Sequence, residues 1–263
     1  MTTQKHTIVL IGSGNVATQL GIALHEAGYF ISQVYSPTKR SAEALSKRIN
    51  AEAITDLKKL ALNASVYILA VKDDAIALVA KELKLKDKLI VHTSGSVPMD
   101  VLKTASKNYG VFYPLQTFSK DKQIDFRTVP VCIEANSKET SDQLQYFAKS
   151  ISGNVKKVNS EQRRKIHLAA VFACNFSNHM YVIADKLLAK DKLSFDLLRP
   201  LIQETADKIK NNAPAKMQTG PAIRGDKATI GAHTKLLGKE KNLQRIYTLL
   251  SESIISSGKK NKV

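Results

Sequence analysis

Four polar side chains interrupt an apolar stretch, HLAAVFACNFSNHMY, at residues 167–181. They are His167, Asn175, Asn178 and His179, and on an ideal helix His167 and Asn175 would lie about 80° apart. An imidazole can act as a general acid or base near neutral pH, and an amide can orient a substrate. The same pattern also fits a buried helix whose histidine and asparagine bond to each other and to nearby carbonyls. Both interpretations stay open for His167, whereas His179 fits the structural one better.

A second group of residues, GSGNVA, follows the first apolar run of the chain and precedes an amphipathic stretch that ends at Gly28. In this context Gly12 allows a tight turn, Gly14 lets the backbone approach a pyrophosphate, and the small Ala17 allows close packing of helix on strand. The helix N-terminus attracts the anion, and Gly28 suits a left-handed helix cap. The pattern predicts a dinucleotide site whose contacts are Gly12, Ser13, Gly14, Asn15 and Val16.

The residues after the second strand-like run indicate which dinucleotide binds. NAD sites usually carry an acid there, but this chain has Ser36, followed closely by Lys39 and Arg40. A hydroxyl and two cations suit the 2′-phosphate of NADP and offer no carboxylate for the ribose of NAD. We therefore expect NADP and consider NAD the weaker candidate. The alternative is that SPTKRS is only a charged turn that caps a helix.

Two further strand-like runs, SVYILAV and KLIVHTS, end in residues that can reach a ligand, because open α/β sheets bind ligands at the carboxyl ends of their strands. Small hydroxyl residues beside Gly95 leave room for a nicotinamide ring. Asp73 and Asp74 fit better as helix caps. The expected cofactor contacts are Val71, Lys72 and Thr93, and Ser94 is an expected substrate contact.

The elements that must position these residues fall into two parts. Up to residue 158, eight short β-branched runs alternate with helical patterns, which predicts a mostly parallel, helix-covered sheet of the Rossmann type. From Ser160 onward the pattern is helical, with breaks near Asp191 and across NNAPAKMQTGPAIRGD. We predict an NADP-binding α/β domain at 1–158 and an all-α domain at 159–263.

Composition narrows the functional classes. The net charge is +17, but the lysines are scattered over turns and helix surfaces without a nucleic-acid fold motif, which argues against nucleic acid as a partner. The two cysteines, Cys132 and Cys174, form no metal-ligand pattern and suit a reducing compartment. The sequence shows no signal pattern and no run of 18 apolar residues. We expect a cytoplasmic protein without a metal or a membrane span.

Six stretches, in this order, resemble a known family: GSGNVATQL, ILAVKDDAI, VHTSGS, YPLQTFS, HLAAVFACNFSNHMY and TGPAIRGD. The family joins a Rossmann-like domain to a C-terminal domain of unknown function, number 2520, and its members carry NADP oxidoreductase labels. It is similar to the 6-phosphogluconate dehydrogenase-like group, which includes 3-hydroxyisobutyrate dehydrogenase and pyrroline-5-carboxylate reductase. The resemblance covers nearly the whole chain and implies a homodimer formed through the helical domain.

The resemblance also exposes a departure. Hydroxyacid dehydrogenases of that group place a catalytic lysine four residues before an asparagine; the asparagine here would be Asn175, and Val171 occupies the lysine position. His167 can replace the lysine as proton donor or acceptor. Arg224, in the Gly/Pro-rich loop of the helical part, is a candidate substrate clamp, with a structural salt bridge as the alternative. Asp226 fits as the cap of a following helix.

Together these features predict an NADP-dependent oxidoreductase that transfers a hydride between the nicotinamide and a small carbonyl, imine or hydroxy compound held between the domains. The predicted catalytic residues are His167, Asn175, Ser94 and Arg224. The main alternative is a protein that binds NADP as a sensor or regulator and catalyses nothing, which the absent lysine permits. A basic nucleic-acid-binding module is a third, weaker hypothesis.

Overall fold

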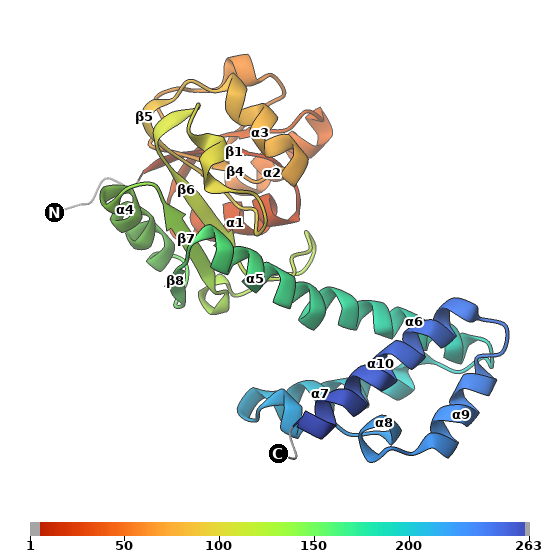
Figure 1. The fold of residues 1–263 in the computed structure, drawn as a ribbon. Helices are drawn as coiled ribbons and strands as arrows, with labels where there is room; N and C mark the ends of the chain where they lie inside the picture. The colour runs from red at the N-terminus through yellow and green to blue at the C-terminus, as the bar shows by residue number, and fades with distance from the viewer. Residues whose placement is uncertain (1–5, 261–263) are drawn as a thin grey trace. The chain divides into compact units, whose positions relative to one another are not determined.

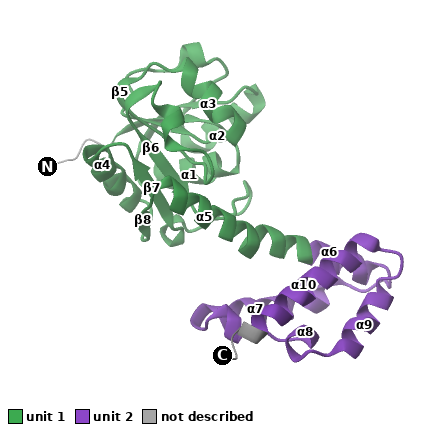
Figure 2. Cartoon of the chain, viewed as in Figure 1, with its two compact units in different colours: residues 1–180 green, residues 181–263 purple. Residues whose placement is uncertain are grey.

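The computed structural model describes residues 6–260 and divides the chain into two compact units, residues 1–180 and residues 181–263 (Figure 2). The first unit contains the whole of the sheet, which Figure 1 shows in red to green. The second unit is helical. The fold class predicted from the sequence, a Rossmann-type α/β part followed by helices, is confirmed.

Eight strands form one sheet in the order β3-β2-β1-β4-β5-β6-β7-β8. Neighbouring strands are parallel except for the pair β6 and β7, which is antiparallel. Because the order reverses between β1 and β4, the carboxyl ends of these strands open a crevice where such sheets bind ligands. The strands are β1 (Thr7–Ile11), β2 (Phe30–Tyr35), β3 (Glu52–Ile54), β4 (Val66–Leu69), β5 (Lys86–His92), β6 (Ser106–Pro114), β7 (Val131–Ala135) and β8 (Val155–Lys157).

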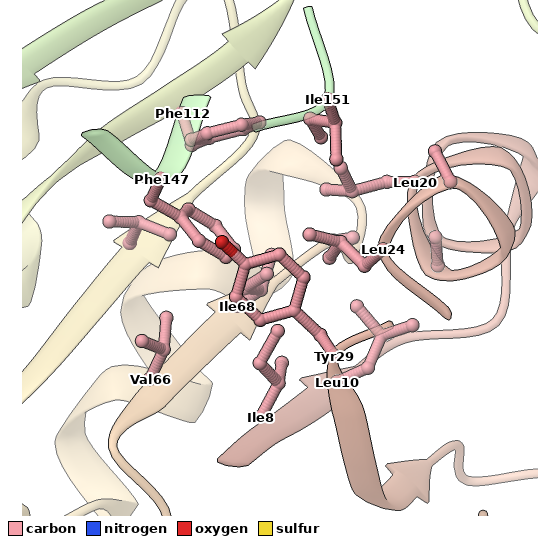
Figure 3. Packing of buried hydrophobic residues seen from close by; sticks show 14 of the residues in the cluster. Ile8, Leu10, Leu20, Leu24, Tyr29, Val66, Ile68, Phe112, Phe147 and Ile151 are labelled. Atoms are coloured by element: carbon pink, nitrogen blue, oxygen red, sulfur yellow. The ribbon is translucent and has the colours of Figure 1, made fainter. Parts of the chain in front are cut away.

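Helices cover both faces of the sheet, which explains why its strands read as continuous apolar runs. On β1, Ile8 and Leu10 face a core shared with α1, α2 and α4, whereas Val9 and Ile11 face the core under α3. Figure 3 shows the first core, where the rings of Tyr29 and Phe147 meet edge to face. Burying each such side chain stabilises the fold by about 2 kcal/mol. The helices are α1 (Asn15–Glu26), α2 (Lys39–Ile49), α3 (Asp73–Glu82) and α4 (Lys138–Lys149).

A long helical run connects the sheet to the second unit. It consists of α5 (Ser160–Ala170), the π-helical turn η4 (Val171–Phe176) and α6 (Ser177–Ala189). Asn159 and Gln162 start it with a reciprocal capping box. The compact first unit runs to residue 180 and includes α5, which contacts the loop after β5 and the end of β6.

The apolar stretch in this helical run is not buried in the single chain, contrary to the buried helix considered from its sequence. Phe172 is 63% exposed and Leu168 is 59% exposed. One face of the run meets the sheet loops, and its large apolar side chains project from the other faces. The π turn also changes the ideal helical angle between His167 and Asn175, because a π turn holds an extra residue.

The second unit contains the end of α6 and four further helices, and no strand follows Lys157 among the described residues. Asp226 accepts a hydrogen bond from the Thr229 amide at 3.0 Å and so caps α9, as predicted. Across residues 6–260, no helix is both long enough and apolar enough to cross a membrane. The further helices are α7 (Arg199–Asn211), α8 (Pro221–Arg224), α9 (Lys227–Leu236) and α10 (Lys241–Lys260).

Candidate active site

A cavity of about 440 Å³ lies in the first unit, at the carboxyl ends of β4, β5 and β6. Loops of the sheet line one side of it, and α5 with the π turn lines another. Six of the residues predicted from the sequence line the cavity, and other lining residues include Gly95, Tyr113 and Val171. The predicted residues in it are Val16, Val71, Thr93, Ser94, His167 and Asn175.

The glycine turn before α1 has two glycines with different roles. Gly12 has φ of 125°, and a Cβ built on it would stand 2.2 Å from the carbonyl oxygen of Ala70. Only glycine fits there, because the neighbour is backbone. A Cβ on Gly14 would meet no atom within 4 Å. The open space at Gly14 is the feature a pyrophosphate needs, so the turn fits a dinucleotide.

The start of α1 is suited to an anion. Its N-cap residue, Gly14, offers no side-chain cap, and the first turn carries no acidic residue. The helix dipole and its first amide groups therefore face no competing negative charge within the turn. Asn15 donates to the carbonyl of Phe118 at 2.9 Å, which ties the loop after β6 to this helix.

The residues predicted to select NADP lie together after β2. Ser36 is buried, and its amide donates to the carbonyl of Ile54 at 3.1 Å. Lys39 and Arg40 begin α2 and are exposed. Lys39 is 3.9 Å from Glu43, an exposed pair that contributes little and leaves the cation available. These side chains do not line the cavity, and their contact with a 2′-phosphate stays a prediction.

The loop after β5 is held in place from inside the sheet. The Ser94 amide donates to Nδ1 of buried His92 at 3.2 Å. The Ser94 hydroxyl accepts from the amides of Ser96 and Val97, each at 3.1 Å, so it organises the loop as well as lining the cavity. Ser96 donates to the Asp73 carboxylate, and Asp73 also lines the cavity. Among the described residues, no side chain caps α3, so the expectation that Asp73 caps this helix was wrong.

Arg163 anchors α5 against this loop. Its guanidinium is fully buried, donates to the Ser94 carbonyl at 2.9 Å and pairs with Glu134 at 3.1 Å. Burial and the charge of Arg163 together lower the pKa of His92 to about 4. The sequence did not identify Arg163, because SEQRRK reads as the exposed polar start of a helix.

His167 lies one helical turn after Arg163 and contacts a residue that sequence reasoning missed. Its Nδ1 is 3.0 Å from the hydroxyl of Tyr113, and the two rings meet edge to face with centroids 5.9 Å apart. A Cβ on Gly95 would stand 2.7 Å from Cγ of His167, so glycine is what lets the imidazole approach the loop. The signal that could have identified Tyr113 is its hydroxyl at the carboxyl end of an apolar strand, where ligands bind.

The other predicted residues of the helical part are distributed differently. Asn175 and Val171 both line the cavity. The position where related dehydrogenases would carry lysine therefore presents the apolar side chain of Val171 to the cavity. Asn178 and His179 are exposed and do not line it. Arg224 is exposed at the end of α8 in the second unit, and its role as a substrate contact stays a prediction.

Two family models match the chain. Residues 7–95 match the family described as NADP oxidoreductase coenzyme F420-dependent, and residues 129–254 match the domain of unknown function DUF2520. No curated protein matches the chain. A protein from Bacteroides fragilis, named provisionally as an NADP oxidoreductase, is 47% identical, with a TM-score of 0.91 over 96% of this chain and 98% of that one.

More distant solved structures share the fold. TM1727 from Thermotoga maritima is 22% identical, with a TM-score of 0.74 over 97% of this chain and 100% of that one. An imine reductase from Myxococcus stipitatus, in complex with NADP+, is 15% identical, with a TM-score of 0.63 over 97% of this chain and 93% of that one. These likenesses support the architecture alone.

The sheet and the glycine turn define a Rossmann-type fold. The chain belongs to the family that joins an NADP oxidoreductase domain to a DUF2520 domain. The resemblance noted from the sequence is thereby confirmed, and NADP is the cofactor of the family, as predicted.

Proposed function

We propose that this protein transfers a hydride between NADP(H) and a small carbonyl, imine or hydroxy compound bound in the cavity beside His167. One observation carries the proposal. The glycine turn, open at Gly14, and a cavity lined by an imidazole lie at the same edge of the sheet, and Val16, in the first turn of α1, lines the cavity. A nicotinamide placed at this edge would have a proton-transfer group beside it.

The cofactor would be held along the carboxyl edge of the sheet. Backbone groups of Gly12 to Val16 bind the pyrophosphate, and Ser36, Lys39 and Arg40 bind the 2′-phosphate. Val71, Lys72 and Thr93 contact the nicotinamide half. The cofactor supplies the hydride, whereas the protein's own residues bind the substrate and move the proton.

His167 supplies or accepts that proton, and Asn175 orients the substrate. Both line the cavity, and the hydrogen bond between Nδ1 and the Tyr113 hydroxyl fixes the position of the imidazole. Ser94 and Arg224 are the proposed further substrate contacts. The Ser94 carbonyl accepts from Arg163, and its hydroxyl accepts from two amides and lies 3.3 Å from the Ser96 hydroxyl. A substrate contact would therefore replace the bond between the two hydroxyls.

Replacing His167 tests this assignment. His167→Ala should lower turnover at least a hundredfold, because a positioned acid or base contributes about 10²–10⁴ in rate. Its NADPH affinity, measured by fluorescence titration, should not change. His179→Ala is the matched control, because His179 lies on the same helical run but does not line the cavity. Wild-type turnover in His167→Ala would remove His167 from the mechanism.

A second function, an NADP sensor without catalysis, is favoured by one observation. Val171 lines the cavity at the position where related dehydrogenases carry lysine. A panel of small imines and 2-oxo acids, followed at the nicotinamide absorbance, separates the two functions. The sensor would bind NADPH and oxidise it with no member of the panel.

We also propose that the protein is a homodimer formed through its helical part. Phe172 and Phe176 are 63% and 49% exposed, and their rings contact each other with centroids 5.0 Å apart. Such a cluster is typical of a face covered by another chain. Phe172→Glu should shift the molar mass in light scattering from dimer to monomer, whereas Leu78→Glu, on α3, should not. A wild-type monomer would contradict the proposal.

The proposed compartment is the cytoplasm. Cys132 and Cys174 are both free thiols, and Cys174 is exposed. An exposed free thiol suits a reducing compartment. Cell fractionation with an antibody against the protein would test this, and recovery outside the cytoplasm would contradict it.

A further inference from the structure

We propose that Tyr113 is a second catalytic residue: its hydroxyl hands the proton to the substrate, and His167 reloads it. This inference rests on the proposed oxidoreductase function and names the group that touches the substrate. Nothing in the sequence pattern suggested it, because Tyr113 is the next-to-last residue of an apolar strand.

Geometry pairs the two residues. Tyr113 and His167 come from elements 54 residues apart, yet Nδ1 and the hydroxyl oxygen are 3.0 Å apart, and both side chains line the cavity. Tyr113 is only 9% exposed, so its ring is fixed by the sheet. A tyrosine on a rigid strand holds its hydroxyl more precisely than a residue on a loop would.

Two other contacts hold the imidazole in this position. Gly95 leaves the space that the ring occupies, since any Cβ there would stand 2.7 Å from it. Arg163, four residues earlier and therefore on the same face of α5, fixes the helix to the Ser94 carbonyl. The same helix face thus meets the loop after β5 twice, and the imidazole is directed to Tyr113.

The proton transfer balances in the direction of reduction. The carbonyl oxygen or imine nitrogen gains an electron pair when its carbon receives the hydride from NADPH. In the same step it takes the hydrogen of Tyr113, so that the tyrosine O–H bond breaks as the product O–H or N–H bond forms. The Nδ1–H of an imidazolium His167 gives its proton to the tyrosine oxygen, leaving a neutral tyrosine and a neutral imidazole. Solvent reprotonates the imidazole.

The surroundings of Tyr113 explain why it needs a partner. Burial, the largest cause, raises the pKa of Tyr113 to about 12, so its anion is disfavoured. A tyrosine that released its proton alone would remain as that anion. His167 gives its proton to the tyrosine oxygen while the hydroxyl hydrogen leaves, so the tyrosine anion does not form.

A kinetic double-mutant cycle tests the relay. The probes are 1-pyrroline and 2-oxobutanoate, a cyclic imine and a 2-oxo acid, each with NADPH. Tyr113→Phe and His167→Ala should each lower kcat about a hundredfold, and the double variant should lose no more than the worse single variant, because the two act as one unit. Tyr109→Phe is the control: Tyr109 is on the same strand, and its hydroxyl donates to Asp100 at 3.3 Å instead.

The outcomes separate the relay from the function it rests on. Normal kcat in Tyr113→Phe with loss in His167→Ala would overturn the relay and leave the proposed role of His167 intact. Losses that multiply in the double variant would also overturn it. Normal kcat in both variants would remove both proposals. Unchanged melting temperature and NADPH affinity in Tyr113→Phe would exclude a merely structural effect.

Nuclear magnetic resonance of the full chain, labelled with ¹⁵N-histidine, tests the pair without any substrate. The ring signals of His167 are identified by their loss in His167→Ala. Tyr113→Phe should shift these signals, and Tyr109→Phe should not. Ring signals of His167 that are the same in wild type and Tyr113→Phe would show that the hydrogen bond is not present in solution, and would overturn the proposal.

Discussion

Replacing Gly14 with alanine should separate cofactor binding from folding. The backbone at Gly14 has φ of −75°, which alanine adopts without strain, and the added Cβ meets no atom within 4 Å. Folding stability should therefore stay the same or rise by about 0.4–1 kcal/mol, because alanine restricts the unfolded chain. In the complex, the methyl group would occupy the space through which the pyrophosphate approaches the turn.

The cost to binding can be estimated from the contact that would be lost. A hydrogen bond between a backbone amide and a charged phosphate contributes about 1.5–3 kcal/mol. Its loss would weaken NADPH binding roughly ten- to a hundredfold. Fluorescence titration with NADPH measures this change, and urea unfolding of the same sample measures stability.

Gly12→Ala is the matched comparison. Its Cβ would stand 2.2 Å from the Ala70 carbonyl oxygen, and its φ of 125° is strained for alanine. Strain and overpacking together should cost about 2–6 kcal/mol of folding stability. We therefore expect Gly12→Ala to lose stability and Gly14→Ala to lose binding. Wild-type NADPH affinity in Gly14→Ala would refute the placement of the pyrophosphate.

Two further predictions concern charge. Lys39→Glu combined with Arg40→Glu should weaken NADPH binding at least tenfold and leave NADH binding unchanged. Lys47→Glu, at the far end of α2, is the control and should change the binding of neither nucleotide. Equal losses of affinity for both nucleotides would contradict the 2′-phosphate site. Folding lowers the pKa of His92 from about 6.5 to about 4. Between these pH values the unfolded chain holds more of the proton than the folded chain, so folding stability rises with pH across this range. Urea unfolding should show about 2 kcal/mol less stability near pH 5 than near pH 7.5, and His92→Asn should lack this difference.

Short-range patterns predicted most of the fold. All eight strands overlap the runs that predicted them. Central strands such as β1 and β4 were readable because a strand buried on both faces needs apolar residues at nearly every position. Gly28 has φ of 81°, as its place after an amphipathic helix indicated. The glycine turn was equally readable, since the close approach of Gly12 to the backbone at Ala70 leaves no room for another residue.

The site depended on contacts that no local pattern encodes. Tyr113 and His167 meet because β6 and α5 are brought together by the sheet, across 54 residues of sequence. The buried guanidinium of Arg163 is paired by Glu134 and the Ser94 carbonyl, which come from distant parts of the chain. The exposure of Phe172 was missed because an apolar pattern predicts that a side chain is covered but does not say whether its own chain or another chain covers it.

A crystal structure of the NADP+ complex would test the central claim most directly. We expect the pyrophosphate at Gly14 and the 2′-phosphate near Lys39 and Arg40. The nicotinamide ring should lie in the cavity beside Gly95, Tyr113 and His167. A nucleotide bound elsewhere, or a nicotinamide ring outside the cavity that contains His167, would contradict it.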